Sequence, residues 1–132
     1  MPIFNMTGGG ATFTKTGTLL WQNQNPTSSM ADYTATLNGS YLEFSLLKIV
    51  FQYATSLERT TSIYIEPEKL GAEGSGAEFM FALGVAHVSG NPCARAVYRV
   101  SDTQIKFSNC RRISSGASEP QLSVPLEIYG IK

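Results

Sequence analysis

The stretch ARAVYRVSDTQIKFSNC, residues 94–110, decides the fold of this chain. Apolar and polar side chains alternate on both sides of a short polar segment, which is the pattern of a β-hairpin. The apolar side chains share one face before the turn and one face after it: Ala96, Tyr98, Val100, Ile105 and Phe107. A two-residue loop at 101–102 and a four-residue loop at 101–104 both put these sets on the same side. The two loops differ in length by two residues, and a shift of two residues leaves every side chain on the same face of the sheet.

The hairpin also predicts a basic face. Arg95, Arg99 and Lys106 point away from the apolar set in either register, and Arg111 and Arg112 extend the charge beyond the second strand. One interpretation is the solvated face of an edge hairpin. The other is a basic patch that binds an anionic surface polymer or a carboxylate of a neighbouring subunit.

Two cysteines, Cys93 and Cys110, flank the same hairpin. The two-residue loop places them directly opposite one another, where a disulfide is geometrically possible, whereas the four-residue loop makes them diagonal neighbours. We expect two reduced thiols, because a reducing cytosol normally keeps cysteines free. Without added carboxylates, two cysteines and the single histidine are too few for a closed structural zinc site. We therefore expect no metal and no cofactor.

The rest of the chain consists of short apolar segments between clusters of Gly, Pro, Ser, Thr and Asn, which predicts a nearly all-β protein with two packed sheets. We expect strands at 11–15, 18–22, 31–38, 42–54, 62–66, 79–88, 94–100, 104–110 and 124–131. Within 42–54 the apolar parity changes near Leu47, which predicts a bulge there. An amphipathic helix over 41–52 competes with this strand, but the β-branched and aromatic residues after Lys48 favour the strand.

Length and charge limit the organisation of the protein. The 132 residues suit one domain, and we expect a Gly-rich joint at 1–10 followed by a single domain at 11–132. The formal net charge is zero and 15% of the residues are charged, which argues against nucleic acid as a partner. The sequence contains neither an apolar run of membrane-spanning length nor a signal-like N-terminus. We therefore expect a soluble protein made in the cytoplasm, without membrane insertion.

Catalytic patterns are weak. His87 is the only histidine and lies in a predicted strand, so we expect it in the core or on a sheet face. No serine stands in the strand-turn-helix context that usually holds a nucleophile. Four glutamates lie in the Gly-rich segment 66–78, whose composition indicates an exposed loop without fixed carboxylate spacing. We therefore expect that the protein is not an enzyme and has no catalytic residues.

Aromatic residues and amides carry the binding hypothesis. Trp21 precedes the segment QNQNP at 22–26, whose amides offer paired donors and acceptors to hydroxyl-rich ligands. Turn chemistry is the alternative interpretation of that segment, because Asn and Pro also set tight backbone conformations. The candidate ligand-binding residues are Trp21, Asn23, Asn25, Tyr64, Arg95, Arg99, Arg111 and Arg112.

Three segments carry a family resemblance: LLWQNQNPTSSMA at 19–31, RVSDTQIKFSNC at 99–110 and VPLEIYGIK at 124–132. In these segments the chain resembles C-terminal domains of bacteriophage tail-fibre and related virion-appendage proteins, and its first ten residues resemble the joint to an upstream shaft. The resemblance implies a two-sheet antiparallel β-sandwich, jelly-roll-like and trimeric, that is displayed on the virion. It implies no catalytic residues.

On this basis we expect a tail-fibre tip that binds a host cell-surface polysaccharide or another receptor through weak contacts repeated over three subunits. Its partners would be two further copies, the host glycan and an upstream fibre or other virion protein. The alternative is a structural module without a host ligand: a head fibre, a capsid decoration or a trimerisation cap. The last strand, 124–132, has apolar residues on both faces, which fits pairing within its own chain or with a neighbour.

Overall fold

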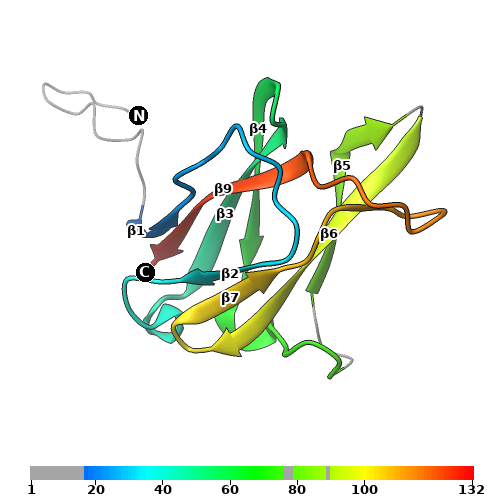
Figure 1. The fold of residues 1–132 in the computed structure, drawn as a ribbon. Helices are drawn as coiled ribbons and strands as arrows, with labels where there is room; N and C mark the ends of the chain where they lie inside the picture. Colours follow the sequence, from blue (N-terminus) through cyan, green and yellow to red (C-terminus); the bar gives the residue numbers. More distant parts are fainter. Residues whose placement is uncertain (1–16, 76–78, 89) are drawn as a thin grey trace, which may run out of the picture.

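The computed structural model describes residues 17–75, 79–88 and 90–132, and these residues form strands, loops and two short 3-10 helices (Figure 1). The strands are β1 (Thr18–Gln22), β2 (Tyr33–Thr36), β3 (Leu46–Ala54), β4 (Leu57–Ile65), β5 (Phe79–Val88), β6 (Asn91–Ser101), β7 (Gln104–Phe107), β8 (Arg111–Arg112) and β9 (Leu122–Ile131). The 3-10 helices are η1 (Tyr41–Glu43) and η2 (Pro67–Lys69). The described part of the chain contains no α-helix, which confirms the all-β prediction.

The strands form two antiparallel sheets. The first has the order β1-β9-β3-β4, so the last strand of the chain is central and pairs with two strands of its own chain (Figure 1). The second has the order β2-β7-β6-β5, and the short β8 also pairs with β6. The strands β1 and β9, which lie far apart in the sequence, are therefore neighbours, as are β2 and β7.

One core joins the two sheets. Its fully buried side chains come from β3 and β9 on one side and from β6 and β7 on the other: Leu47, Ile49, Phe51, Ile128, Val97, Ile105 and Phe107. The rings of Phe51 and Phe107 meet edge to face across this core, with 6.0 Å between their centroids. Edge-to-face rings add a directional contact to the apolar burial that stabilises the packing.

Most predicted strands are present, and the differences arise in the longest one. The segment 41–43 is a 3-10 turn because the Ser40 hydroxyl accepts a hydrogen bond from the Leu42 amide (3.2 Å) and so caps it. The strand then begins at Leu46. The bulge predicted near Leu47 is wrong, since the register against β9 shifts between Val50 and Phe51. The alternative helix over 41–52 is also wrong.

The remaining strand predictions need smaller changes. The strands expected at 18–22 and 79–88 have the predicted bounds. Those expected at 31–38, 62–66, 94–100, 104–110 and 124–131 are present with shifted ends. β8 is absent from the predicted strands, because a two-residue strand has no periodicity. The predicted joint at 1–10 and strand at 11–15 lie outside the described residues.

The hairpin of β6 and β7 turns at 102–103 and contains a bulge that reverses its predicted faces. Ser101 pairs with Gln104, but the next pair is Arg99 with Ile105, so Val100 is an extra residue on β6. This one-residue slip exchanges the two faces of β6. Val97 therefore lies in the core, whereas Val100 is 51% exposed.

The same slip turns Arg95 into the protein, so its predicted place on an outer basic face is wrong. Arg95 is 1% exposed, and within the described residues it donates hydrogen bonds to backbone carbonyls alone. The Nε atom donates to Ser123 (2.6 Å), Nη1 to Ser108 (2.8 Å), and Nη2 to Pro120 and Leu122 (both 3.0 Å). Burial lowers the pKa of Arg95 to about 10, so the side chain stays charged at neutral pH. It ties β6 of the second sheet to the segment that leads into β9 of the first.

Cys93 and Cys110 are free thiols in a small second apolar cluster with Ala54 and Leu122. Cys93 stands opposite Arg112 of β8, not opposite Cys110. Burial raises the pKa of both thiols, that of Cys110 to about 11. Because the thiolate is the reactive form, both thiols are expected to be inert in the folded protein.

Replacing Arg95 with Met tests its role as a link between the sheets. The variant leaves several buried carbonyls without donors, so we expect the free energy of unfolding in urea to fall by about 3–5 kcal/mol. Arg95→Lys keeps the charge but loses the forked geometry, and is expected to lose about half as much. The control is Arg111→Met, where the exposed Arg111 donates one hydrogen bond to Gly116, with an expected change below about 0.5 kcal/mol. Equal stability of the two Met variants would contradict the assignment.

Candidate ligand-binding site

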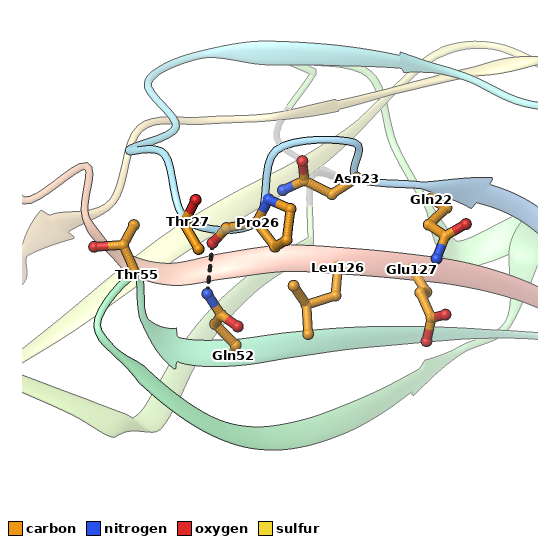
Figure 2. A pocket seen from close by; sticks show the side chains of 8 residues that line it. All are labelled: Gln22, Asn23, Pro26, Thr27, Gln52, Thr55, Leu126 and Glu127. Carbon is orange, nitrogen blue, oxygen red and sulfur yellow. Dashed lines mark hydrogen bonds between the residues drawn. The ribbon is translucent and has the colours of Figure 1, made fainter.

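The connection between β1 and β2 lies across β9 and is held to it at several points. The Asn23 amide nitrogen donates to the Leu126 carbonyl (2.8 Å), and its side-chain Nδ2 donates to the Pro125 carbonyl (2.9 Å). The Asn23 Oδ1 atom accepts from the Asn25 amide (2.7 Å), which closes a turn. From β3, the Gln52 Nε2 atom donates to the Pro26 carbonyl (2.6 Å; Figure 2). These bonds give the connection a fixed shape over the sheet.

A pocket of about 370 Å³ lies between this connection and the strands beneath it. Figure 2 shows the connection bridging β9, with Gln52 and Thr55 reaching the pocket from β3 and the residue that follows it. The lining residues are Gln22, Asn23, Pro26, Thr27, Gln52, Thr55, Leu126 and Glu127. Pro26 and Leu126 contribute the apolar part of this surface, and the other side chains are polar.

Several polar groups of this pocket are available to a ligand. The side chains of Gln22, Thr27 and Thr55 make no hydrogen bond to any residue in the described ranges. Burial raises the pKa of Tyr129, and the nearby Glu127 carboxylate raises it further. The pocket therefore offers one amide, two hydroxyls and one carboxylate beside an apolar surface.

A second hollow of about 250 Å³ lies on the other side of the same connection. It is lined by Asn23, Gln24, Asn25, Ser28, Ser29, Met30, Ala31, Asp32 and Tyr33. Asn23 lines both hollows, so they flank one continuous stretch of backbone. Tyr33 is 43% exposed and offers an aromatic surface beside the amide and hydroxyl groups.

The structure places the aromatic and amide candidates differently. Trp21 is 8% exposed and packs against Tyr33 and Phe107, with 5.8 Å between ring centroids in both pairs. Leu20 and Trp21 are both buried because the register against β9 shifts between Leu19 and Trp21. Trp21 is therefore a core residue and does not offer a stacking face. Asn23 and Asn25 line the second hollow, and the Asn23 side-chain amide also holds the loop in place.

The arginines do not form one basic patch. Arg95 lies in the core, and Arg112 pairs with Glu119, with 2.6 Å between Nε and Oε2. Hydrogen bonds from Gln121 and Arg112 lower the pKa of Glu119. Arg111 donates to Gly116 in the connection that follows β8, and Arg99 lines a third pocket. The positive charges of these arginines therefore lie at separate positions and do not act as one surface.

Tyr64 lies apart from both hollows. It is 55% exposed on β4 and stands opposite Lys48 of β3. Its neighbours Ile63 and Ile65 pack on the core, so the tyrosine ring faces outward. Tyr64 remains a candidate contact residue, but no described pocket includes it.

The prediction missed the residues that the sheet contributes to the first pocket, notably Gln52, Thr55, Leu126 and Glu127. Two signals were present in the sequence. Gln52 is an amide at the end of an apolar strand, and Glu127 is the only acid in the last strand. Neither signal indicates that the two residues line one pocket, because β3 and β9 pair over a long sequence separation.

Comparisons with known proteins give no family for this chain: no protein-family model, curated protein or solved structure matches it. Within the described residues no three His, Cys, Asp or Glu side chains are grouped closely enough to hold a metal ion. None of the helices in the described ranges has the length and apolarity needed to span a membrane.

Gln52→Ala tests how the first pocket keeps its shape. Removing the bond to the Pro26 carbonyl should lower the free energy of unfolding by about 1–2 kcal/mol. We also expect faster hydrogen exchange in 23–28, measured by mass spectrometry, because the loop loses its contact with β3. The control is Gln104→Ala, whose amide makes only a long contact with Thr36 (3.5 Å). Unchanged exchange in 23–28 would contradict the anchoring role of Gln52.

Proposed function

We propose that this chain is a carbohydrate-binding domain of a phage virion appendage, at the tip of a tail fibre, and that it binds a host cell-surface polysaccharide. The observation that supports this most directly is the composition of the first pocket, in which Gln22, Thr27, Thr55 and Glu127 surround an apolar surface. Sugars present hydroxyls at the ring edge and C–H groups on the ring face. Amides, hydroxyls and carboxylates suit the former, and apolar side chains suit the latter.

The proposal includes weak binding at each site. The first pocket is small and open, and only a few polar groups in it are available. Repetition over three subunits would raise the overall affinity, because the second and third contacts form at high effective concentration. The tail-fibre assignment rests on the resemblance of 19–31, 99–110 and 124–132 to such domains. Upstream fibre protein and the host glycan are the proposed partners.

The proposal also concerns the finer description of the fold as a jelly-roll-like β-sandwich. The pairings β1 with β9 and β2 with β7 support it, since β1, β2 and β3 alternate between the two sheets and β9 returns to the first sheet after β5 to β8 of the second. The hairpin of β3 and β4 stays within one sheet. The connection at 23–32 crosses between the sheets at one end of the fold, and the connections that contain η1 and η2 cross at the end that carries the turn between β6 and β7.

A structural module without a host ligand is the second candidate. The observation that favours it is the edge strand β4, which pairs only with β3 and carries the exposed Tyr64. Long edge strands are usually covered or shortened, because their unpaired backbone groups bind other strands. A neighbouring subunit or another virion protein would cover β4 in this case.

The glycan proposal is tested by binding of the purified protein to an array of bacterial surface polysaccharides. Gln22→Ala and Glu127→Gln should each weaken binding to the recognised glycan by tenfold or more, because each removes hydrogen bonds in the first pocket. The matched controls are Gln104→Ala and Glu43→Gln, which lie outside the pocket. Binding to no glycan, or equal binding by all four variants, would contradict the proposal and favour the structural module.

The oligomeric proposal is tested by light scattering over a wide dilution range. We expect a mass of three times the 14.3 kDa of the chain, since a trimer would present three copies of the pocket. A monomer at every concentration would contradict the trimer and would remove the multivalent contribution to affinity.

A further inference from the structure

A third pocket, of about 460 Å³, shares no lining residue with the two hollows beside 23–32. It lies where η1 and η2 meet the turn end of β6. Residues of η1, the stretch from Pro67 to Ala72, Ser75 and Arg99 line it. Of its lining residues, Arg99 alone is among the ligand-binding candidates named from the sequence.

Backbone hydrogen bonds fix the walls of this third pocket. The Tyr41 amide donates to the Asp102 carbonyl (3.0 Å), which ties η1 to the turn between β6 and β7. The Arg99 amide donates to the Gly71 carbonyl (2.8 Å), and Ala72 forms a parallel bridge with Arg99. Since both 3-10 helices are tied to the same hairpin, the cavity does not depend on a loose loop.

Tyr41 brings an unused polar group to this pocket. Its side chain is 0% exposed, and its hydroxyl has no hydrogen-bond partner within the described part of the chain. Buried hydroxyls are normally paired, because an unpaired one has lost its water without compensation. Burial raises the pKa of Tyr41; the nearby charge of Arg99 opposes this rise, and the nearby carboxylate of Asp102 adds to it. The hydroxyl is therefore a donor at neutral pH and lies within the field of Arg99.

Arg99 brings a cation without a partner in the described ranges. It pairs with the buried Ile105, so it stands on the inner face of β6 beyond the last core residue, Val97. Its guanidinium makes no described hydrogen bond or ion pair. Lys69 is a second cation of the lining, and Glu68 is the only acid among the lining residues. The lining thus has an excess of positive charge.

We propose that this third pocket binds a small saccharide that carries a carboxylate, such as a hexuronic acid. The Arg99 guanidinium would take the carboxylate through two parallel hydrogen bonds. The Tyr41 hydroxyl would donate to a further oxygen of the ligand, and Pro67 and Leu70 would contact the sugar ring. The proposal does not depend on the glycan site beside 23–32, because the two sites share no residue.

Calorimetric titration of the full chain with sodium glucuronate tests this proposal, with glucose and sodium acetate at matched ionic strength as the comparison ligands. We expect saturable binding of glucuronate at about 1 mM or tighter, and at least tenfold weaker binding of glucose and acetate. Arg99→Gln should weaken glucuronate binding by tenfold or more. Arg111→Gln is the matched control, because Arg111 is exposed and lies outside the pocket, and it should bind as the unchanged protein does.

Tyr41→Phe separates a binding role from a structural one. It removes only the unpaired hydroxyl, so we expect an unchanged or higher melting temperature together with at least threefold weaker glucuronate binding. Unchanged binding in Tyr41→Phe or in Arg99→Gln would overturn the proposal. Equal binding of acetate and glucuronate would overturn the assignment to a saccharide. None of these results depends on Gln22 or Glu127, so failure here and failure of the first site are distinguishable.

Discussion

The guanidinium of Arg95 is the interaction on which the rest of the structure depends. It holds four backbone carbonyls from 108 and 120–123 around one buried cation. Because the side chain must face inward to reach them, it determines which face of β6 meets the core. Val97 then packs in the core, and Arg99 reaches the end of the same face. The segment that Arg95 holds leads directly into β9, where Ser123 adopts a positive φ of 48°.

β9 begins at the segment that Arg95 holds and continues to the first pocket. It lies between β1 and β3 and carries Leu126 and Glu127 into the lining. Near its end, Gly130 lies against the Phe44 ring so closely that a Cβ atom would come within 2.5 Å of the ring. The ring closes the end of the sheet over this glycine. β9 thus completes the first sheet and also accepts the hydrogen bonds that hold the segment 23–27 in place.

The two proposed sites differ in chemistry as well as in position. The first is mainly uncharged and suits neutral hydroxyl-rich ligands, whereas the third pocket combines Arg99 with a buried, unpaired tyrosine hydroxyl. Both lie where connections meet strand ends, which is where rigid β frameworks usually carry recognition. A framework with two such places can contact an extended polymer at separate points. Function on this fold is argued from sites, because the fold alone does not identify an activity.

The all-β class and the position of most strands follow from the sequence alone, because two-residue alternation and turn residues are local signals. The amides of 22–26 are likewise visible without any fold. The burial of Trp21 and Arg95 and the hydrogen bond from Gln52 to the Pro26 carbonyl depend on tertiary packing and cannot be read from the sequence. The physical reason is register. A single bulge residue such as Val100 exchanges the faces of a strand, and its position is selected by packing between distant segments.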